Sequence, residues 1–143
     1  MTQQPISRLV AQPMTMHCVD FNGQLRPIEA SFGYDPNDPY AVWITFHSAG
    51  GDVRWGLCRS LVAGGMTDPV GEGDVQLWPS IDDDGRAVVM FEFCSPDGEL
   101  VAHARTSDIY RFLSRTLQAV PFGSEGTQID MDALIFELID SAE

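Results

Sequence analysis

The sequence has 143 residues, 44% of them hydrophobic and 20% charged, which predicts one domain with a substantial hydrophobic core. All eight basic residues are arginine and 21 residues are acidic, so the formal net charge is −13. This charge disfavours nucleic acid and anionic lipid as partners, because both repel the chain at long range. No stretch approaches the roughly 20 apolar residues of a membrane-spanning helix, so no membrane span is expected.

The first residues of the chain lack the apolar core of a secretory signal, which indicates a cytoplasmic protein, and residues 1–13 are expected to be flexible. Strands are predicted over residues 14–21 and 24–32. Asn22-Gly23 lies between them and is typical of a two-residue hairpin turn. Residues 35–39 combine two prolines with two aspartates and an asparagine, and they form the strongest loop signal in the chain.

A second hairpin is predicted from two segments rich in aromatic and β-branched residues, 40–47 and 52–58. A helix of one or two turns should follow over residues 59–63. Gly64-Gly65 would end it, since glycine is favoured just after the end of a helix.

The second half of the chain also begins with strands. These are predicted over residues 74–78, ending at Pro79, and over residues 86–94 and 99–104. Because proline has no backbone N–H, it should not continue a paired strand.

The hydrophobic period then changes from two to about 3.6 residues. Thr106 or Ser107 is expected to cap a helix that reaches Val120, and Asp130 to cap a terminal helix with a continuous apolar stripe. The predicted fold is therefore α+β, with antiparallel sheets in a half-open barrel or two packed layers, one short helix and two longer C-terminal helices. The whole of residues 1–143 is expected to form a single domain.

The motifs for small-molecule or metal binding are weak. Gly71-Glu72-Gly73 lacks the third glycine and the following helix of a dinucleotide site. Residues 82–85 lack the alternating oxygen ligands of a calcium loop and are predicted to be a solvated turn. His17, His47 and His103 lie on three separate predicted strands without metal-ligand spacing. No cofactor and no metal are expected.

The three cysteines are widely spaced and are interpreted as reduced, mostly buried thiols. Cys58 lies where a strand is expected to meet a helix, so a helix terminus there could lower the pKa of its thiol. A cysteine enzyme would need such a thiol, and no motif for an oxyanion site accompanies it. No catalytic residue is assigned.

Trp43, Trp55 and Trp78 fall on predicted strands, where tryptophan is more often a core residue than a binding platform. Stacking on single-stranded nucleic acid would require basic side chains beside these rings, and only Arg54 and Arg59 are near one in sequence. The terminal apolar stripe, flanked by Phe136, favours self-association instead.

Several segments in matching order resemble the SsgA-like proteins, the sporulation and cell-division regulators of actinobacteria, and the chain is closest in kind to their SsgB members. The resemblance covers about residues 15–140. The segments that carry it are YDPNDPYAVWITFH from Tyr34, VRWGLCRSLVAGGM from Val53, PVGEGDVQLWPS from Pro69, SPDGEL from Ser95 and FLSRTLQAVPFGSE from Phe112.

This resemblance implies a non-enzymatic protein that positions the division septum by recruiting or stabilising the tubulin-like GTPase FtsZ. It also implies SsgA-type paralogues as partners, a homotrimer, a cytoplasmic location at septum sites and a fold similar to the Whirly single-stranded-DNA-binding proteins. A single-stranded nucleic-acid-binding module is therefore the alternative function. The family pattern Arg-Asp-Leu-Leu is replaced here by Arg59-Ser60-Leu61-Val62, which leaves the paralogue open.

Partner contacts are expected from exposed apolar residues, from strand edges or from the loop around residues 35–40. The candidate partner-binding residues are Asp35, Asp38, Tyr40, Trp55, Arg59, Trp78, Arg115 and Phe136.

Overall fold

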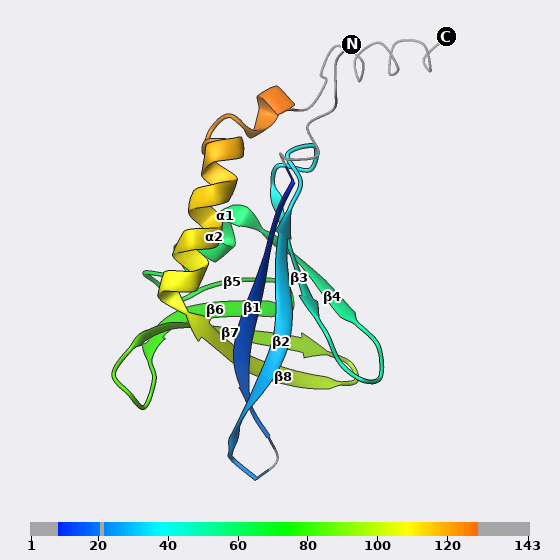
Figure 1. Cartoon of the computed structure of the whole chain (residues 1–143), viewed down its shortest axis with the longest axis vertical. Coiled ribbons are helices and arrows are strands. Elements are labelled where there is room, and N and C mark those ends of the chain that lie inside the picture. The colour runs from blue at the N-terminus through cyan, green and yellow to red at the C-terminus, as the bar shows by residue number, and fades with distance from the viewer. Residues whose placement is uncertain (1–8, 21, 129–143) are drawn as a thin grey trace.

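The computed structural model describes residues 9–20 and 22–128, in which eight strands form one antiparallel sheet with the order β4-β3-β2-β1-β8-β7-β6-β5. Helices α1 and α2 each follow four strands along the chain (Figure 1). The elements are β1 (Val10–Val19), β2 (Leu25–Tyr34), β3 (Ala41–Phe46), β4 (Val53–Cys58), α1 (Arg59–Gly64), β5 (Val70–Glu72), β6 (Val75–Ile81), β7 (Ala87–Ser95), β8 (Gly98–Arg105), α2 (Thr106–Ala119) and the 3-10 helix η2 (Glu125–Gln128).

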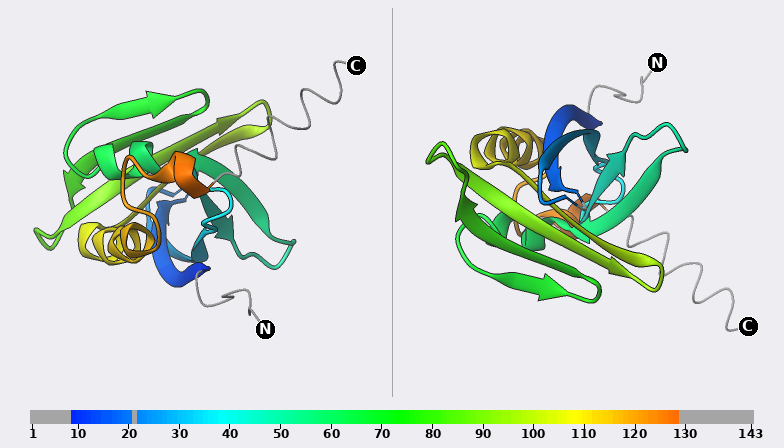
Figure 2. Two further views of the ribbon diagram at one scale, coloured as in Figure 1. Left: turned by 90° about the horizontal axis from the view of Figure 1, so that it is seen from above. Right: turned by 90° about the horizontal axis from the view of Figure 1, so that it is seen from below.

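The sheet consists of two four-stranded meanders joined by β1 and β8, and the end-on views of Figure 2 show them as two walls of a curved sheet. The cross-strand partners at this junction are His17 with His103 and Cys18 with Ala102. The sheet does not close, because β4 and β5 remain as its two edges. The predicted α+β fold with an antiparallel half-open barrel is confirmed.

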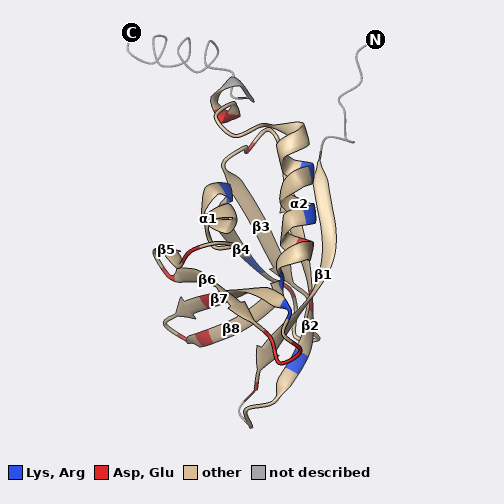
Figure 3. Ribbon diagram, turned by 90° about the vertical axis from the view of Figure 1, so that its left-hand side faces the viewer, with Lys and Arg blue, Asp and Glu red and all other residues tan. Residues whose placement is uncertain are grey.

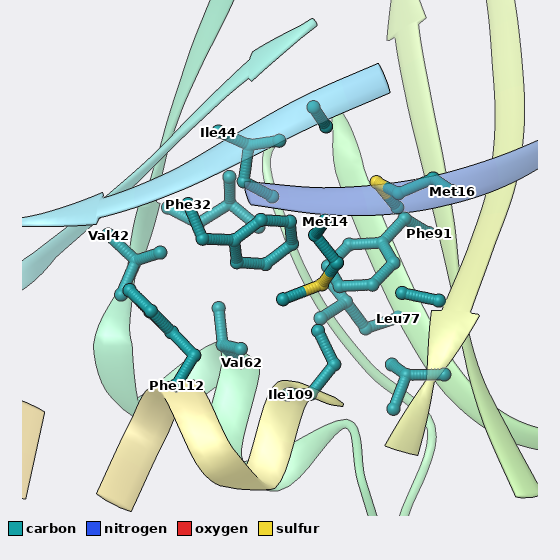
Figure 4. Packing of buried hydrophobic residues seen from close by; sticks show 14 of the residues in the cluster. Met14, Met16, Phe32, Val42, Ile44, Val62, Leu77, Phe91, Ile109 and Phe112 are labelled. Atoms are coloured by element: carbon teal, nitrogen blue, oxygen red, sulfur yellow. The ribbon is translucent and has the colours of Figure 1, made fainter. Parts of the chain in front are cut away.

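The core lies between the concave side of the sheet and the two helices (Figure 4). Phe32 of β2 is fully buried at its centre, with ring centroids 6.1 Å from Phe91 and 5.5 Å from Phe112, both edge to face. Edge-to-face packing of this kind stabilises a core beyond the area that it buries. Helix α2 contributes Ile109, Phe112 and Leu113 to this core, which confirms its predicted apolar face.

Strand β1 begins at Val10 rather than at residue 14. Residues 10–13 pair with residues 31–34 of β2, so the expectation of a flexible start is wrong for this part of the segment. The alternation of buried Val10, Gln12 and Met14 with exposed neighbours is the strand period that the sequence analysis missed.

Strand β6 also runs through Pro79, where the sequence predicted its end. The carbonyl of Asp74 accepts a hydrogen bond from the N–H of Cys94, so these two residues form a hydrogen-bonded pair. Because hydrogen-bonded and non-hydrogen-bonded pairs alternate along antiparallel strands, Pro79 occupies a non-hydrogen-bonded position opposite β7. On its other side, β5 pairs only as far as Leu77 of β6. No backbone partner is therefore lost at Pro79.

The predicted short helix is confirmed as α1, with Gly65 as its C-cap. Helix α2 begins at Thr106 without a side-chain cap hydrogen bond, so the predicted cap is wrong. The expected terminal helix lies outside the described residues. No helix within residues 9–20 and 22–128 has the length and hydrophobicity needed to cross a bilayer.

Candidate functional site

The loop between β2 and β3 is held by its own side chains. The buried Tyr34 hydroxyl donates to the carbonyl oxygen of Pro39 at 2.8 Å, and Oδ1 of Asp35 accepts from the N–H of Asn37 at 2.9 Å. The carbonyl of Asp35 also accepts from the N–H of Asp38. Asp35 therefore shapes the loop, and Asp38 and the 53% exposed Tyr40 are the residues that it presents.

These two residues lie at the rim of a surface hollow of about 520 Å³, named here the Trp43 hollow. Its walls come from β3, β4, α1 and the turn between β5 and β6, so it lies where the two edges of the open sheet approach each other. The lining residues are Asp38, Tyr40, Ala41, Trp43, Gly56, Leu57, Cys58, Leu61, Glu72, Gly73 and Val75.

Trp43 is fixed on the outer face of the sheet. Its cross-strand partner is Gly56, and a Cβ atom placed on that glycine would lie 2.9 Å from the indole ring. The guanidinium carbon of Arg54 lies 4.0 Å from the ring centroid, and Nε1 donates to Oδ2 of Asp38 at 3.3 Å. The ring is thus held by Arg54, by Asp38 and by the backbone of Gly56. Because Gly56 has no side chain, the ring can lie flat against β4.

The thiol of Cys58 connects the two sheet edges, because it donates a hydrogen bond to Glu72 of β5. Burial raises the pKa of this thiol, and the hydrogen bond and negative charge of Glu72 raise it further. A catalytic cysteine needs the opposite shift. The position at a strand-to-helix junction was predicted correctly, but the lowered pKa considered for a cysteine enzyme is wrong.

Arg59 was expected to contact a partner, and this expectation is wrong for the folded chain because its side chain is only 1% exposed. One terminal nitrogen donates to the carbonyls of Thr116 at 3.2 Å and Val120 at 2.7 Å at the end of α2, where the Thr116 carbonyl also accepts from the N–H of Val120 at 2.8 Å. The other donates to Glu125 at 2.9 Å. Arg59 therefore ties α1 to the end of α2 and to η2.

The charge of Arg59 is compensated from several directions. Its guanidinium hydrogen bond lowers the pKa of Glu125, whose other oxygen accepts from the N–H of Gly123 at 2.8 Å. The rings of Tyr34 and Phe122 lie 4.9 and 4.7 Å from the guanidinium carbon. Only its Nε lacks a hydrogen-bond partner within the described part of the chain. Such a fully enclosed cation is a structural element rather than a recognition group.

The other predicted site residues do not gather at the hollow. Trp55 faces the core, with its ring centroid 5.0 Å from that of Phe93. Trp78 is half-buried on β6 and lines a separate hollow beside Pro69. Arg115 is exposed on α2 and donates to the carbonyl of Ala11 at 3.1 Å. Phe136 lies outside the described residues.

His17 and His103 stack across the β1–β8 junction with ring centroids 5.6 Å apart, a convergence the sequence analysis did not predict. Burial lowers the pKa of His103, and the neighbouring His17 lowers it further. His47 lies apart, hydrogen-bonded to Ser31 at 2.8 Å. No group of three or more His, Cys, Asp or Glu side chains suited to a metal occurs in residues 9–20 and 22–128.

Two of the glycine-containing motifs form turns. Gly71-Glu72-Gly73 belongs to the β5–β6 hairpin, with Gly73 at a φ of 60°. Asp82 accepts backbone hydrogen bonds from Asp84 and Arg86, which closes the β6–β7 turn. The predicted solvated turn at residues 82–85 is therefore confirmed.

Sequence reasoning did not select Trp43, Leu61 or Glu72 as site residues. A signal for Trp43 was available, because Val42, Ile44 and Phe46 alternate with it and are all buried. A tryptophan out of phase with such a core face must lie on the opposite face of the strand. No local signal could place Leu61 and Glu72 beside it, since they belong to α1 and to the other sheet edge.

The surroundings of the hollow are acidic rather than basic. Among the residues that the structure describes, its lining contains the carboxylates of Asp38 and Glu72 and no arginine or histidine, and Arg54 already lies over the Trp43 ring. Acidic positions also gather at the turns and strand ends of β5–β8 (Figure 3). This charge distribution is opposite to that of a nucleic-acid stacking platform.

Comparisons with known proteins place these features in a family. The family model of the Streptomyces sporulation and cell division protein SsgA matches residues 28–125. The sporulation-specific cell division protein SsgB of Frankia casuarinae is 40% identical over 114 residues, which cover 79% of this chain and 79% of that protein.

Solved structures agree with the sequence match. A structure of SsgB, mutations in which correlate to longitudinal cell division during sporulation of Streptomyces coelicolor, has a TM-score of 0.80 and 38% identity, covering 85% of this chain and 95% of that one. An SsgA-like sporulation-specific cell division protein from Thermobifida fusca has a TM-score of 0.82 and 32% identity, covering 96% and 98%. The chain therefore belongs to the SsgA family of sporulation and cell division proteins.

Proposed function

We propose that this protein regulates sporulation-specific cell division by binding other proteins and that it catalyses no reaction. The observation that carries the proposal is the match to SsgA and SsgB, which extends over residues 28–125 in the family model and over most of the chain in the solved structures. The direct partner is FtsZ, which the protein recruits to or stabilises at the septum. SsgA-type paralogues are further partners.

Two features of the described chain support a binding role over an enzymatic one. The pKa of Cys58, the only nucleophile singled out in the sequence, is raised by burial and by Glu72. The largest feature around it is a mostly apolar hollow whose rim carries the exposed Tyr40. Exposed aromatic residues beside an apolar surface are typical of protein contacts.

The proposal includes a homotrimer acting in the cytoplasm at division sites. Co-sedimentation of the purified full chain with GTP-assembled FtsZ tests the recruiting role, and light scattering on the same preparation tests the trimer. Saturable binding to the polymer is the expected result. A folded protein that stays in the supernatant at every concentration would refute direct recruitment, and the same assay with a paralogue added would then test an indirect route.

A single-stranded nucleic-acid-binding module is the competing hypothesis. Fluorescence anisotropy with labelled single-stranded oligonucleotides at low salt separates the two, because phosphate binding weakens steeply as salt rises. We expect no salt-sensitive binding, since the net charge is −13 and the Trp43 hollow is lined by carboxylates.

A further inference from the structure

We propose that the Trp43 hollow and the adjoining edge of β4 bind an extended segment of a partner protein that carries both apolar and basic side chains on one face of the strand. The segment would add a strand to β4 and place an apolar side chain against Trp43. This proposal rests on the function proposed above, namely that the protein acts by binding other proteins. It assigns the surface and the chemistry of the bound segment.

The first argument is the hydrogen bonding of β4. This strand pairs only with β3 in the described sheet. The N–H of Arg59 donates to the carbonyl of Tyr40 at 2.7 Å, which makes these two residues a hydrogen-bonded pair. Because such pairs alternate along antiparallel strands, residues 53, 55 and 57 face β3 and the backbone groups of Arg54 and Gly56 face outward.

Within residues 9–20 and 22–128, this edge also has little protection. Natural sheets cover their edges with proline, bulges, charged side chains or loops. Strand β4 contains no proline, its pairing with β3 is continuous from Val53 to Cys58, and its one charged side chain, Arg54, lies over the Trp43 ring. At Gly56 the Trp43 ring fills the place of a side chain, and the backbone groups of this residue still face outward along the edge.

The third argument is the shape and charge of the hollow beside this edge. The side chains of Trp43, Leu61 and Val75 give it an apolar floor and walls, and Asp38 and Glu72 are the only charged residues among its described lining. An entering strand alternates its side chains between two faces, so every second side chain would face the hollow, where apolar ones can meet its floor and a basic one can meet the carboxylates. Acidic peptides would be repelled.

The test uses the full chain and a fluorescein-labelled peptide of about eight residues, within the usual range of strand lengths, with a repeating Val-Val-Arg-Arg order so that each face carries both residue types. Three unlabelled competitors are compared: the same peptide, a valine–glutamate peptide, and the valine–arginine composition with a central proline. We expect only the first to displace the probe. Equal displacement by the proline peptide would overturn strand addition, and equal displacement by the glutamate peptide would overturn the charge argument.

A pair of variants at one position isolates the backbone contribution. R54P and R54T both remove the guanidinium from Trp43, but only R54P removes the outward N–H, without breaking a bond to β3. We expect R54P to bind the peptide at least about tenfold more weakly than R54T, because a ladder hydrogen bond is lost and the proline ring obstructs the edge. Equal affinities of two variants with native near-ultraviolet circular dichroism would overturn the proposal.

A second pair isolates the charge. D38N with E72Q keeps oxygen acceptors for the Trp43 indole and the Cys58 thiol, whereas D97N with E99Q makes the same charge change on the exposed β7–β8 hairpin. We expect the first pair to weaken peptide binding about fivefold or more and the second to have little effect. Equal losses would show that only the net charge matters, which would overturn a local site.

The same variants separate this inference from the proposed function. If FtsZ co-sediments with the wild type and with R54P alike, recruitment stands and the β4 edge is not the binding surface. If the wild type does not co-sediment, recruitment fails, while the peptide titrations still decide the inference. A lower mass for R54P than for R54T by light scattering would assign the edge to a second copy of the chain and overturn the proposal.

Discussion

Replacing Arg59 by methionine removes a buried cation while keeping most of the side-chain volume. The substitution leaves the carbonyl of Val120 without its Arg59 donor, removes one of two donors from the carbonyl of Thr116, and leaves Glu125 without its cationic partner. Because Arg59 is 1% exposed, water cannot replace these interactions without local opening. The R59M variant therefore tests whether this residue holds the two helices together.

The expected loss in the free energy of unfolding is about 3–5 kcal/mol, the usual cost of removing one partner from a buried ion pair. This corresponds to a fall in the melting temperature of about 10 °C or more for a chain of this size. It also corresponds to a drop of about 2 M in the urea midpoint. The buried Nε of Arg59 has no hydrogen-bond partner within the described residues, which reduces the stability of the native protein. Removing this group reduces the expected loss, so the range extends down to about 3 kcal/mol.

Urea unfolding at pH 7, followed by tryptophan fluorescence and far-ultraviolet circular dichroism, measures this loss. R54M is the matched control, because it removes an exposed arginine, and it should change stability by no more than about 0.5 kcal/mol. R59M combined with E125Q should be more stable than R59M alone, since it removes the uncompensated carboxylate. If R59M and R54M unfold at the same urea concentration, the reasoning about Arg59 is refuted.

Three further predictions concern other parts of the fold. The pKa of His103 in the folded chain lies below its ordinary value of 6.5. As the pH falls, the unfolded chain therefore binds a proton at this residue before the folded chain does, and the free energy of unfolding should decrease as the pH drops through that value. H103Q should flatten this slope between pH 7 and 5.5 in urea titrations, and an unchanged slope would contradict the assignment. G65A should lower the melting temperature because its methyl would lie 2.7 Å from Leu77 Cβ, whereas alanine at the preceding residue, with 3.4 Å to its nearest neighbour, should be tolerated. Cys58 should react with iodoacetamide more slowly in the folded protein than in urea, and E72Q should speed that reaction; a fast native reaction would disprove the raised thiol pKa.

The local elements of this protein follow from local sequence chemistry. Asn22-Gly23 and residues 82–85 bring turn-forming residues to the points where hairpins reverse, and both turns occur at the predicted places. The predicted two-residue length of the first turn is wrong, because Asp20 pairs with Gln24 and three residues separate them. The 3.6-residue spacing of Ile109, Phe112 and Leu113 predicted the buried face of α2. These signals are readable because turn geometry and helix periodicity depend on neighbours within a few residues.

The pairing of β1 with β8 had no such signal, because it joins segments more than 80 residues apart. The same pairing stacked His17 on His103, which the sequence could not bring together. At Pro79 a local rule gave a wrong prediction, because proline was expected to end the strand. Strand β5 pairs with β6 only as far as Leu77, so no neighbouring strand requires a backbone N–H at residue 79, and β6 continues through it.

The residues of the candidate site can also be divided into those that the sequence could predict and those that it could not. The half-open antiparallel fold, the family resemblance and the loop that carries Asp38 and Tyr40 could all be predicted from the sequence. The enclosure of Arg59 as a structural cation, and the positions of Trp43 and Glu72 at the hollow, became clear from the packing of distant elements. The physical reason is that burial and convergence depend on which distant elements pack together, and a charge or an aromatic ring looks the same in sequence whether it is covered or exposed.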